Sequence, residues 1–280
     1  MATRNSQRNS HVGRMLKGKP RAPVRVVPWL EVNYPDRDHV AHAIEGLRIW
    51  QTITDTAIVS TVPRQSRIYT ELRRQVPGMS LIPGIKTAPA LGDDPLGNLK
   101  RWETLAGEIA SSCQAAGETR FLLENEKAFS EHPGGKPEFD LGKLREGLGK
   151  LPADLEYLWY PSVEGGGQRL RRRVAMCEVV QDVLDVRFVD HTSLRRPVTG
   201  RAPTTSKAST VLNAAAAKPT IPMVHCRNAD HWHFEGMARA FKLVARGWGS
   251  GSVCIPYPGE ARWLPAARAI AALIRERWLV

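Results

Sequence analysis

Two glutamates that flank a single asparagine are the sharpest chemical signal in the sequence. Glu124 and Glu126 follow three apolar residues in the segment FLLENEKAF. In a β-strand, the alternation of side chains puts both carboxyl groups on one face, where each raises the pKa of the other. One of them is then expected to stay protonated near neutral pH, as a general acid must. The alternative is a structural ion pair, in which Lys86 or Arg227 neutralises one glutamate.

Other polar and aromatic side chains gather near the ends of short apolar runs. A charged side chain turned toward apolar helices would be buried without a partner, at a cost of several kcal/mol. We therefore expect these side chains to converge on one shared site. The expected catalytic residues are Glu126, Glu124, Asp190 and Glu260, and the expected substrate-binding residues are Glu31, Asn33, Lys86, Trp159, Tyr160, His191, His225, Arg227 and Tyr257.

The apolar runs themselves predict β-strands. There are eight of them, at residues 24–33, 56–62, 80–87, 120–126, 155–162, 186–193, 221–227 and 251–258. The segments between them mostly carry apolar residues at spacings of three and four, which is typical of amphipathic helices. This alternation indicates βα units around a parallel sheet. Eight such units close into a (β/α)₈, or TIM, barrel, which we expect to be a single domain over residues 24–280.

An open, doubly wound α/β sheet is the alternative fold. Such a sheet normally binds a nucleotide through a glycine-rich turn after its first strand, but the turn here reads EVNYPDRDHV and lacks GxGxxG. The barrel is therefore preferred. In barrel enzymes the active site lies at the C-terminal ends of the strands, where the polar residues above occur.

The Asn125-Glu126 pair resembles the large clan of barrel glycoside hydrolases in which an Asn-Glu pair ends the fourth strand. The resemblance implies that Glu126 is the acid/base residue and that the substrate is a carbohydrate. Aromatic residues near the strand ends agree with a ring-shaped ligand, although flat aromatic faces suit nucleobases as well.

The chain departs from that clan at the seventh strand. The clan has its nucleophilic glutamate there, whereas this chain has His225 and Arg227, and Glu235 comes only in the following helix. A glycosidase mechanism would therefore need its second carboxylate elsewhere. The candidates are Asp190, Glu260 and Glu124.

Two other functions stay open at this point. A metal-assisted hydrolase or lyase would use Asp190, His191, His225 and His231, but the sequence has no HExxH motif and no closely spaced cysteine pair. We therefore expect no metal and no other cofactor. A barrel without catalysis, serving as a carbohydrate-binding or structural module, is the other alternative.

The composition is that of a soluble globular chain, with 42% hydrophobic and 24% charged residues in 280. Part of the net charge of +12 comes from residues 1–23, which are rich in Arg and Lys and contain no Asp or Glu. We expect this segment to be a flexible tail, with contact to anionic surfaces or nucleic acid as an alternative role.

No apolar run resembles a membrane span or a secretory signal. We therefore expect a cytoplasmic protein without a membrane partner. The oligomeric state does not follow from the sequence.

Overall fold

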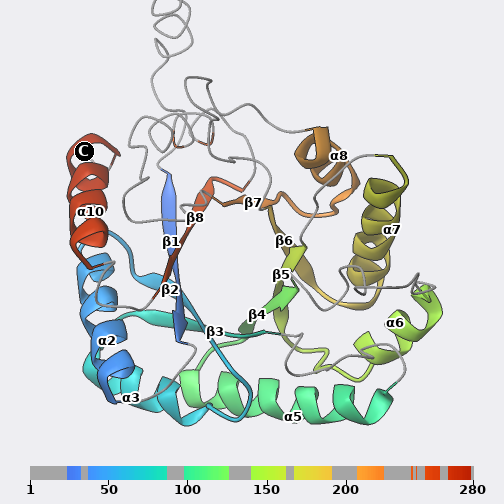
Figure 1. The fold of residues 1–280 in the computed structure, drawn as a ribbon, viewed down its shortest axis with the longest axis horizontal. Helices are drawn as coiled ribbons and strands as arrows, with labels where there is room; N and C mark the ends of the chain where they lie inside the picture. Colours follow the sequence, from blue (N-terminus) through green and yellow to red (C-terminus); the bar gives the residue numbers. More distant parts are fainter. Residues whose placement is uncertain are drawn as a thin grey trace, which may run out of the picture.

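Eight parallel strands form the centre of this computed structural model, which describes residues 24–32, 37–86, 98–125, 140–161, 167–190, 207–223, 241, 244, 250–258 and 264–278. The order in the sheet is β7-β6-β5-β4-β3-β2-β1-β8. A parallel bridge between Met223 and Cys254 joins the two edges next to β7 and β8, so the sheet nearly closes on itself. The expected (β/α)₈ barrel is thus confirmed (Figure 1). The strands are β1 (Arg25–Val32), β2 (Thr56–Thr61), β3 (Ser80–Lys86), β4 (Arg120–Asn125), β5 (Glu156–Pro161), β6 (Val186–Asp190), β7 (Ile221–Pro222) and β8 (Ser252–Pro258).

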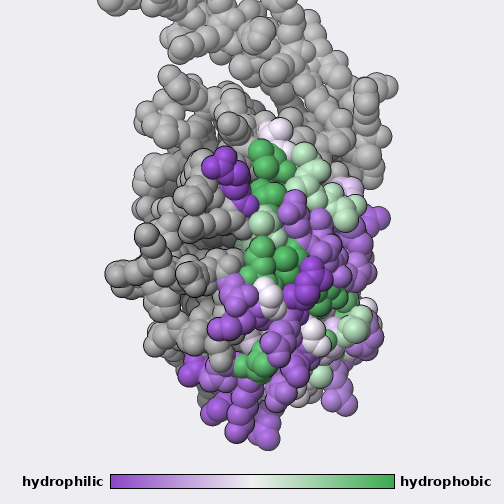
Figure 2. Space-filling model, turned by 90° about the vertical axis from the view of Figure 1, so that its right-hand side faces the viewer, coloured by the Kyte–Doolittle hydropathy of each residue, from purple (hydrophilic) through white to green (hydrophobic). Residues whose placement is uncertain are grey.

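Helices form a ring around the strands (Figure 1). Figure 2 shows one side of this ring, where hydrophilic residues cover most of the coloured surface and apolar residues appear between them. The expected basic tail, residues 1–23, lies outside the described residues. The described helices are α2 (Arg37–Gln51), α3 (Arg67–Gln75), α5 (Leu99–Ala116), α6 (Leu141–Leu148), α7 (Gly167–Val183), α8 (Lys207–Ala215) and α10 (Leu264–Trp278).

In helix α5, the local sequence determines where the helix begins, where it ends and which face is buried. The side chain of Asn98 accepts a hydrogen bond from the Arg101 amide and so caps the first turn. Gly117 ends the helix with a φ of 63°, a left-handed conformation that glycine adopts without steric cost. Trp102, Leu105 and Ile109 are buried on one face, so their spacing turns an apolar stripe toward the strands.

Each strand divides its side chains between two cores. The outward-facing residues, such as Leu30, Phe121 and Phe188, pack with helix residues in two clusters outside the barrel. The inward-facing residues pack with one another inside it; they include Trp29, Ile58, Ile82, Leu122, Leu158, Val189 and Ile221. A shift of one residue along a strand would exchange the two sets.

Inside the barrel, Gly84 lies between Ser60 on β2 and Leu122 on β4 in the strand register. A β-carbon at position 84 would lie 3.0 Å from Leu122 Cβ and 3.2 Å from Ser60 Cβ. Both contacts involve atoms close to the backbone, which cannot move aside easily. The close approach of three strands therefore favours glycine at this position, since any larger residue would push its neighbours apart.

We predict that Gly84→Ala lowers the free energy of unfolding by about 1–3 kcal/mol, because the added methyl group overpacks the barrel interior. Urea denaturation measures the change. The matched control is Gly107→Ala in α5, where a β-carbon would have nothing within 4 Å. There the substitution should stabilise the protein by roughly 0.5–1 kcal/mol, because alanine favours the helix. Equal effects at the two positions would contradict the tight fit at Gly84.

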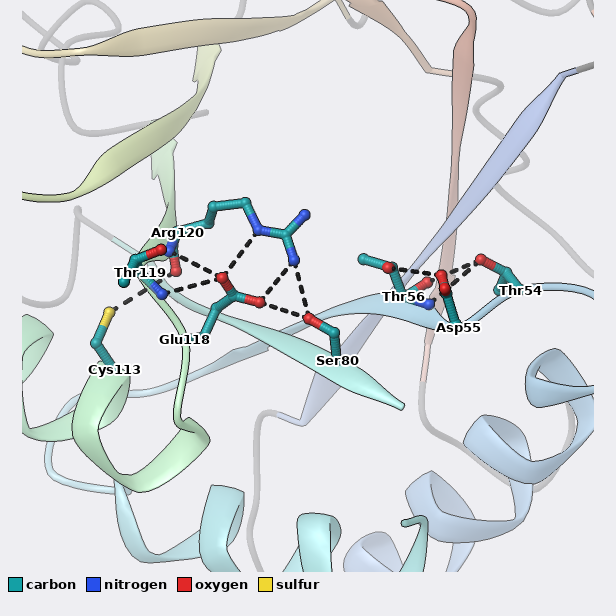
Figure 3. A network of polar contacts seen from close by, with 8 residues as sticks. All are labelled: Thr54, Asp55, Thr56, Ser80, Cys113, Glu118, Thr119 and Arg120. Carbon is teal, nitrogen blue, oxygen red and sulfur yellow. Dashed lines mark hydrogen bonds and ion pairs between the residues drawn. The ribbon is translucent and has the colours of Figure 1, made fainter. Parts of the chain in front are cut away.

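A network of polar contacts ties β3 to β4 at the N-terminal end of the barrel (Figure 3). Arg120 donates from Nε to Glu118 Oε1 at 2.9 Å and from Nη2 to Glu118 Oε2 at 2.6 Å. Ser80 Oγ donates to Glu118 Oε2 at 2.5 Å. Burial acts to raise the pKa of Glu118, but hydrogen bonds from Arg120 and Ser80 outweigh it and lower the pKa from 4.5 to about 2.

This lowered pKa predicts a stability that depends on pH. The unfolded chain binds a proton at position 118 near pH 4.5, whereas the folded chain does so only near pH 2. The stabilisation is therefore complete above pH 4.5 and disappears as the pH falls toward 2. We expect it to be about 2 kcal/mol, since solvent partly screens the Arg120 side chain, which is 33% exposed.

The test is urea unfolding of the wild type and of Glu118→Gln at pH 6 and pH 2.5. The variant should be less stable than the wild type at pH 6, and most of this difference should be absent at pH 2.5. A difference of the same size at both pH values would show that Glu118 stabilises the fold without its charge.

Candidate active site

Four inward-facing residues line the C-terminal end of the barrel within the described part of the chain. Glu31 comes from β1, Lys86 from β3, Glu124 from β4 and Tyr160 from β5. In the strand register Lys86 pairs with Glu124, and Glu124 pairs with Tyr160. The three residues are therefore neighbours on adjacent strands. The sequence analysis predicted that all four lie at this end of the barrel, and the structure places them there.

An ion pair connects β1 to β3 across the intervening strand. Lys86 Nζ lies 3.0 Å from Glu31 Oε2, and the two side chains are 26% and 30% exposed. The sequence analysis considered an ion pair between Lys86 or Arg227 and one of the glutamates at positions 124 and 126, but it did not pair Lys86 with Glu31. The pair offers a charged donor and a charged acceptor at fixed positions to any ligand that enters the barrel mouth.

Glu124 is shielded from solvent, with a relative exposure of 6%. It lies two residues beyond Leu122, which is part of the barrel interior, so strand alternation points its carboxyl group inward. A shielded, inward-facing carboxyl group at this end of the barrel is a candidate for a general acid or base.

Beneath these charged groups, an aromatic pair fills the barrel. The rings of Trp29 and Tyr160 meet edge to face, with centroids 5.3 Å apart and an interplanar angle of 77°. Trp29 Nε1 donates to Ser60 Oγ at 2.8 Å. Both rings are 2% exposed, so they form a floor to the mouth rather than an open stacking platform.

Ser60 is a site-lining residue that the sequence analysis missed. Its side chain is fully buried and holds the Trp29 indole in place. The signal was present in the segment TAIVSTV, because Ser60 shares the alternation phase of Ile58, an interior residue. A polar residue in the inward phase of a strand needs a partner inside the barrel, and here that partner is Trp29.

Two expected site residues face outward instead. Trp159 is fully buried in the cluster between the strands and the helices, so its ring is not available to a substrate in the mouth. Asp190 is also fully buried and shares the outward phase of Phe188. Its Oδ2 lies 3.5 Å from Nδ2 of Asn213 on α8. The expectation that these two side chains enter the mouth is corrected, because the alternation of β5 and β6 turns them toward the helices.

The remaining expected site residues cannot be placed in this way. Of Tyr257, only the backbone is described, and it pairs with Leu30 of β1. The others lie outside the described residues: Asn33, Glu126, His191, His225, Arg227 and Glu260. Among the residues that the structure does describe, no group of three or more His, Cys, Asp or Glu side chains could hold a metal ion. His231, which the metal hypothesis also uses, is outside that part of the chain.

Comparison with known proteins supports the fold. No protein-family model matches the chain, and no curated protein sequence matches it. Among solved structures, a truncated 3-deoxy-D-arabino-heptulosonate 7-phosphate synthase from Thermotoga maritima is similar, with a TM-score of 0.51 and 8% identity over 93% of this chain and 89% of that one. An endo-β-N-acetylglucosaminidase from Cordyceps militaris has a TM-score of 0.51 and 10% identity over 94% of this chain and 95% of that one.

At these identities the likeness concerns the barrel architecture alone. No helix in the described part of the chain is long and apolar enough to cross a membrane.

The partly shielded Lys86–Glu31 pair predicts a measurable coupling. A double-mutant cycle of Lys86→Met and Glu31→Gln should give an interaction energy of about 1 kcal/mol in urea unfolding, at the upper end for accessible ion pairs. The control cycle is Arg145→Met and Asp182→Asn, a pair 2.8 Å apart whose side chains are 52% and 57% exposed. That pair should give about 0.3 kcal/mol or less. A coupling at Lys86–Glu31 no larger than the control would mean that water screens the barrel mouth fully.

Proposed function

We propose that this barrel is a hydrolase that acts on a carbohydrate, with Glu126 as the general acid/base and Glu124 or Glu260 as the partner carboxylate. The observation that carries the proposal is the inward, shielded carboxyl group of Glu124 beside Lys86 at the C-terminal end of the barrel. Active sites of barrel enzymes lie at this end. Glycoside hydrolysis with two carboxyl groups needs one that protonates the leaving oxygen and one that assists on the other side of the sugar ring.

We assign the partner role to Glu124 or Glu260 rather than to Asp190. The reason is geometric, because Asp190 lies against Asn213 of α8 on the outer side of the strands. Glu124, by contrast, faces the barrel interior and lies two residues before Glu126 in the sequence. If β4 continued its regular alternation through position 126, both carboxyl groups would enter the same mouth.

A ligand rich in hydroxyl groups suits the charged pair at the mouth. Hydroxyl groups both donate and accept hydrogen bonds, and the Lys86–Glu31 pair presents donors and acceptors that are about a quarter exposed. Tyr160, which is 2% exposed, would add packing beneath the ligand rather than a stacked face. We therefore propose that Glu31 and Lys86 orient the sugar while Glu124 and Glu126 carry out the proton transfers.

The similar structures are compatible with this proposal but do not decide it. One is an endo-β-N-acetylglucosaminidase and the other a heptulosonate-phosphate synthase, so one architecture serves different reactions. Our choice of glycoside hydrolysis among these reactions rests on the residues at the C-terminal mouth of the barrel.

The test is hydrolysis of a panel of chromogenic aryl glycosides that differ in sugar and anomeric configuration. The wild type should hydrolyse at least one of them, and Glu126→Gln should lower kcat by about 10²- to 10⁴-fold on that substrate, because the amide cannot transfer a proton. Glu124→Gln should lower kcat as well. The matched control is Glu146→Gln, an exposed glutamate on α6, which should leave kcat unchanged.

Three results would count against the proposal. Folded wild-type protein that hydrolyses no glycoside would contradict it directly. Full activity in Glu126→Gln would remove the acid/base assignment and favour a binding or structural barrel. Activity that disappears with a chelator and returns with zinc or manganese would favour the metal-assisted alternative, in which His191 and His225 take part.

A further inference from the structure

A cavity opens at the N-terminal end of the barrel, opposite the proposed active site. Its volume is about 860 Å³, which is within the range of small-molecule pockets. It lies among the first residues of the strands, where barrels normally carry residues for stability rather than for function. Among the described residues of the proposed active site, Glu31, Lys86, Glu124 and Tyr160, none contributes to its lining.

The bottom of this cavity is apolar. Val27, Ile82, Leu158 and Ile221 line it, and all four are part of the barrel interior. These side chains separate the cavity from the aromatic pair beneath the other mouth. An organic ligand could therefore bury an apolar body against the end of the barrel core.

Three arginines also line the cavity: Arg25, Arg120 and Arg187. Their hydrogen-bonding capacity is only partly used. Arg120 uses Nε and Nη2 for Glu118 and Ser80, and Figure 3 shows its other terminal nitrogen directed away from both of these partners. Arg25 is exposed at the start of β1.

Arg187 brings a partly exposed guanidinium group to the cavity wall. Its Nη2 lies 3.4 Å from Glu156 Oε1, and its side chain is 33% exposed. Its Nε is buried and lies out of reach of a ligand in the cavity. An acidic group would therefore accept from the exposed part of this side chain, and a hydrogen bond between charged groups contributes about 1.5–3 kcal/mol.

Two carboxylates share the lining and limit the charge of the ligand. They are Asp55 and Glu156, and Glu156 is also 3.7 Å from Lys218 Nζ. Glu118, which lies behind the wall, neutralises a third charge through its pair with Arg120. Three carboxylates therefore balance the three guanidinium groups, and what favours an acidic ligand is N–H donors that the described residues leave unused, not a net positive charge. This balance suits one negative charge better than several.

We propose that the N-terminal end of the barrel binds a small organic anion, whose single acidic group pairs with Arg187 and Arg120 while its apolar body packs against Ile82, Leu158 and Ile221. A planar acidic group can accept two parallel hydrogen bonds from a guanidinium group, which gives arginine its preference for such ligands. The site is independent of the proposed carbohydrate chemistry at the other mouth.

The test uses 1-naphthoate, which combines one carboxylate with an apolar ring system, in isothermal titration calorimetry. Naphthalene-1-carboxamide has the same shape without the charge, and 1-naphthylmethylammonium has the opposite charge. The wild type should bind 1-naphthoate at least about tenfold more tightly than either analogue, because hydrogen bonds to a charged group contribute about 1.5–3 kcal/mol.

Arg187→Gln should weaken 1-naphthoate binding about tenfold and leave carboxamide binding unchanged. The matched control, Arg145→Gln, removes an exposed arginine on α6 and should have no effect on either ligand. If Arg187→Gln fails to fold by circular dichroism, Arg25→Gln provides the same comparison at an exposed position of the lining.

Equal affinity for the acid and the amide would overturn the proposal, and so would tighter binding of the ammonium. Absence of binding up to the solubility limit of 1-naphthoate would overturn it too. Loss of binding in Lys86→Met but not in Arg187→Gln would place the ligand in the C-terminal mouth and would equally refute the second site.

Discussion

Strict alternation of side chains along eight parallel strands is the constraint on which the rest of this structure depends. Once the strands nearly close into a ring, each residue must face either the barrel interior or the surrounding helices. Position along the strand then decides which end of the barrel a side chain reaches. Glu124 and Arg120 illustrate this, because they share one face of β4 and yet belong to opposite ends of the barrel.

The barrel interior is itself divided into an apolar middle and two polar ends. Trp29, Ile82 and Leu122 belong to the middle, where tight packing favours glycine at position 84. At the C-terminal end, the described charged groups include the partly exposed Lys86–Glu31 pair and the buried Glu124. At the N-terminal end they form networks in which one arginine serves several acceptors (Figure 3). The apolar middle separates the charged residues at the C-terminal end of the barrel from those at the N-terminal end.

The two ends of the barrel hold carboxyl groups in different surroundings. Glu118, with its pKa near 2, contributes to stability through contacts that join the beginnings of β3 and β4. Glu124 is buried at the C-terminal end of β4. The carboxyl group of Glu118 thus stabilises the fold, whereas that of Glu124 is a candidate for catalysis.

The sequence by itself determined the fold class and the approximate starting residues of all eight strands. It could do so because periodicities of two and of about 3.6 residues are local properties, and they recur along the whole chain. It also identified Glu31, Lys86, Glu124 and Tyr160 as residues of the C-terminal mouth, since polar residues at the ends of buried strands have few other acceptable positions.

Only the tertiary structure decided the direction of individual side chains. Asp190 and Trp159 occur at strand ends just as Glu124 and Tyr160 do, but the phase of β5 and β6 turns them toward the helices. That phase depends on pairing with neighbouring strands, which no short segment specifies. The same holds for the Lys86–Glu31 pair and for the N-terminal cavity, because both unite residues far apart in the chain that meet only when the barrel closes.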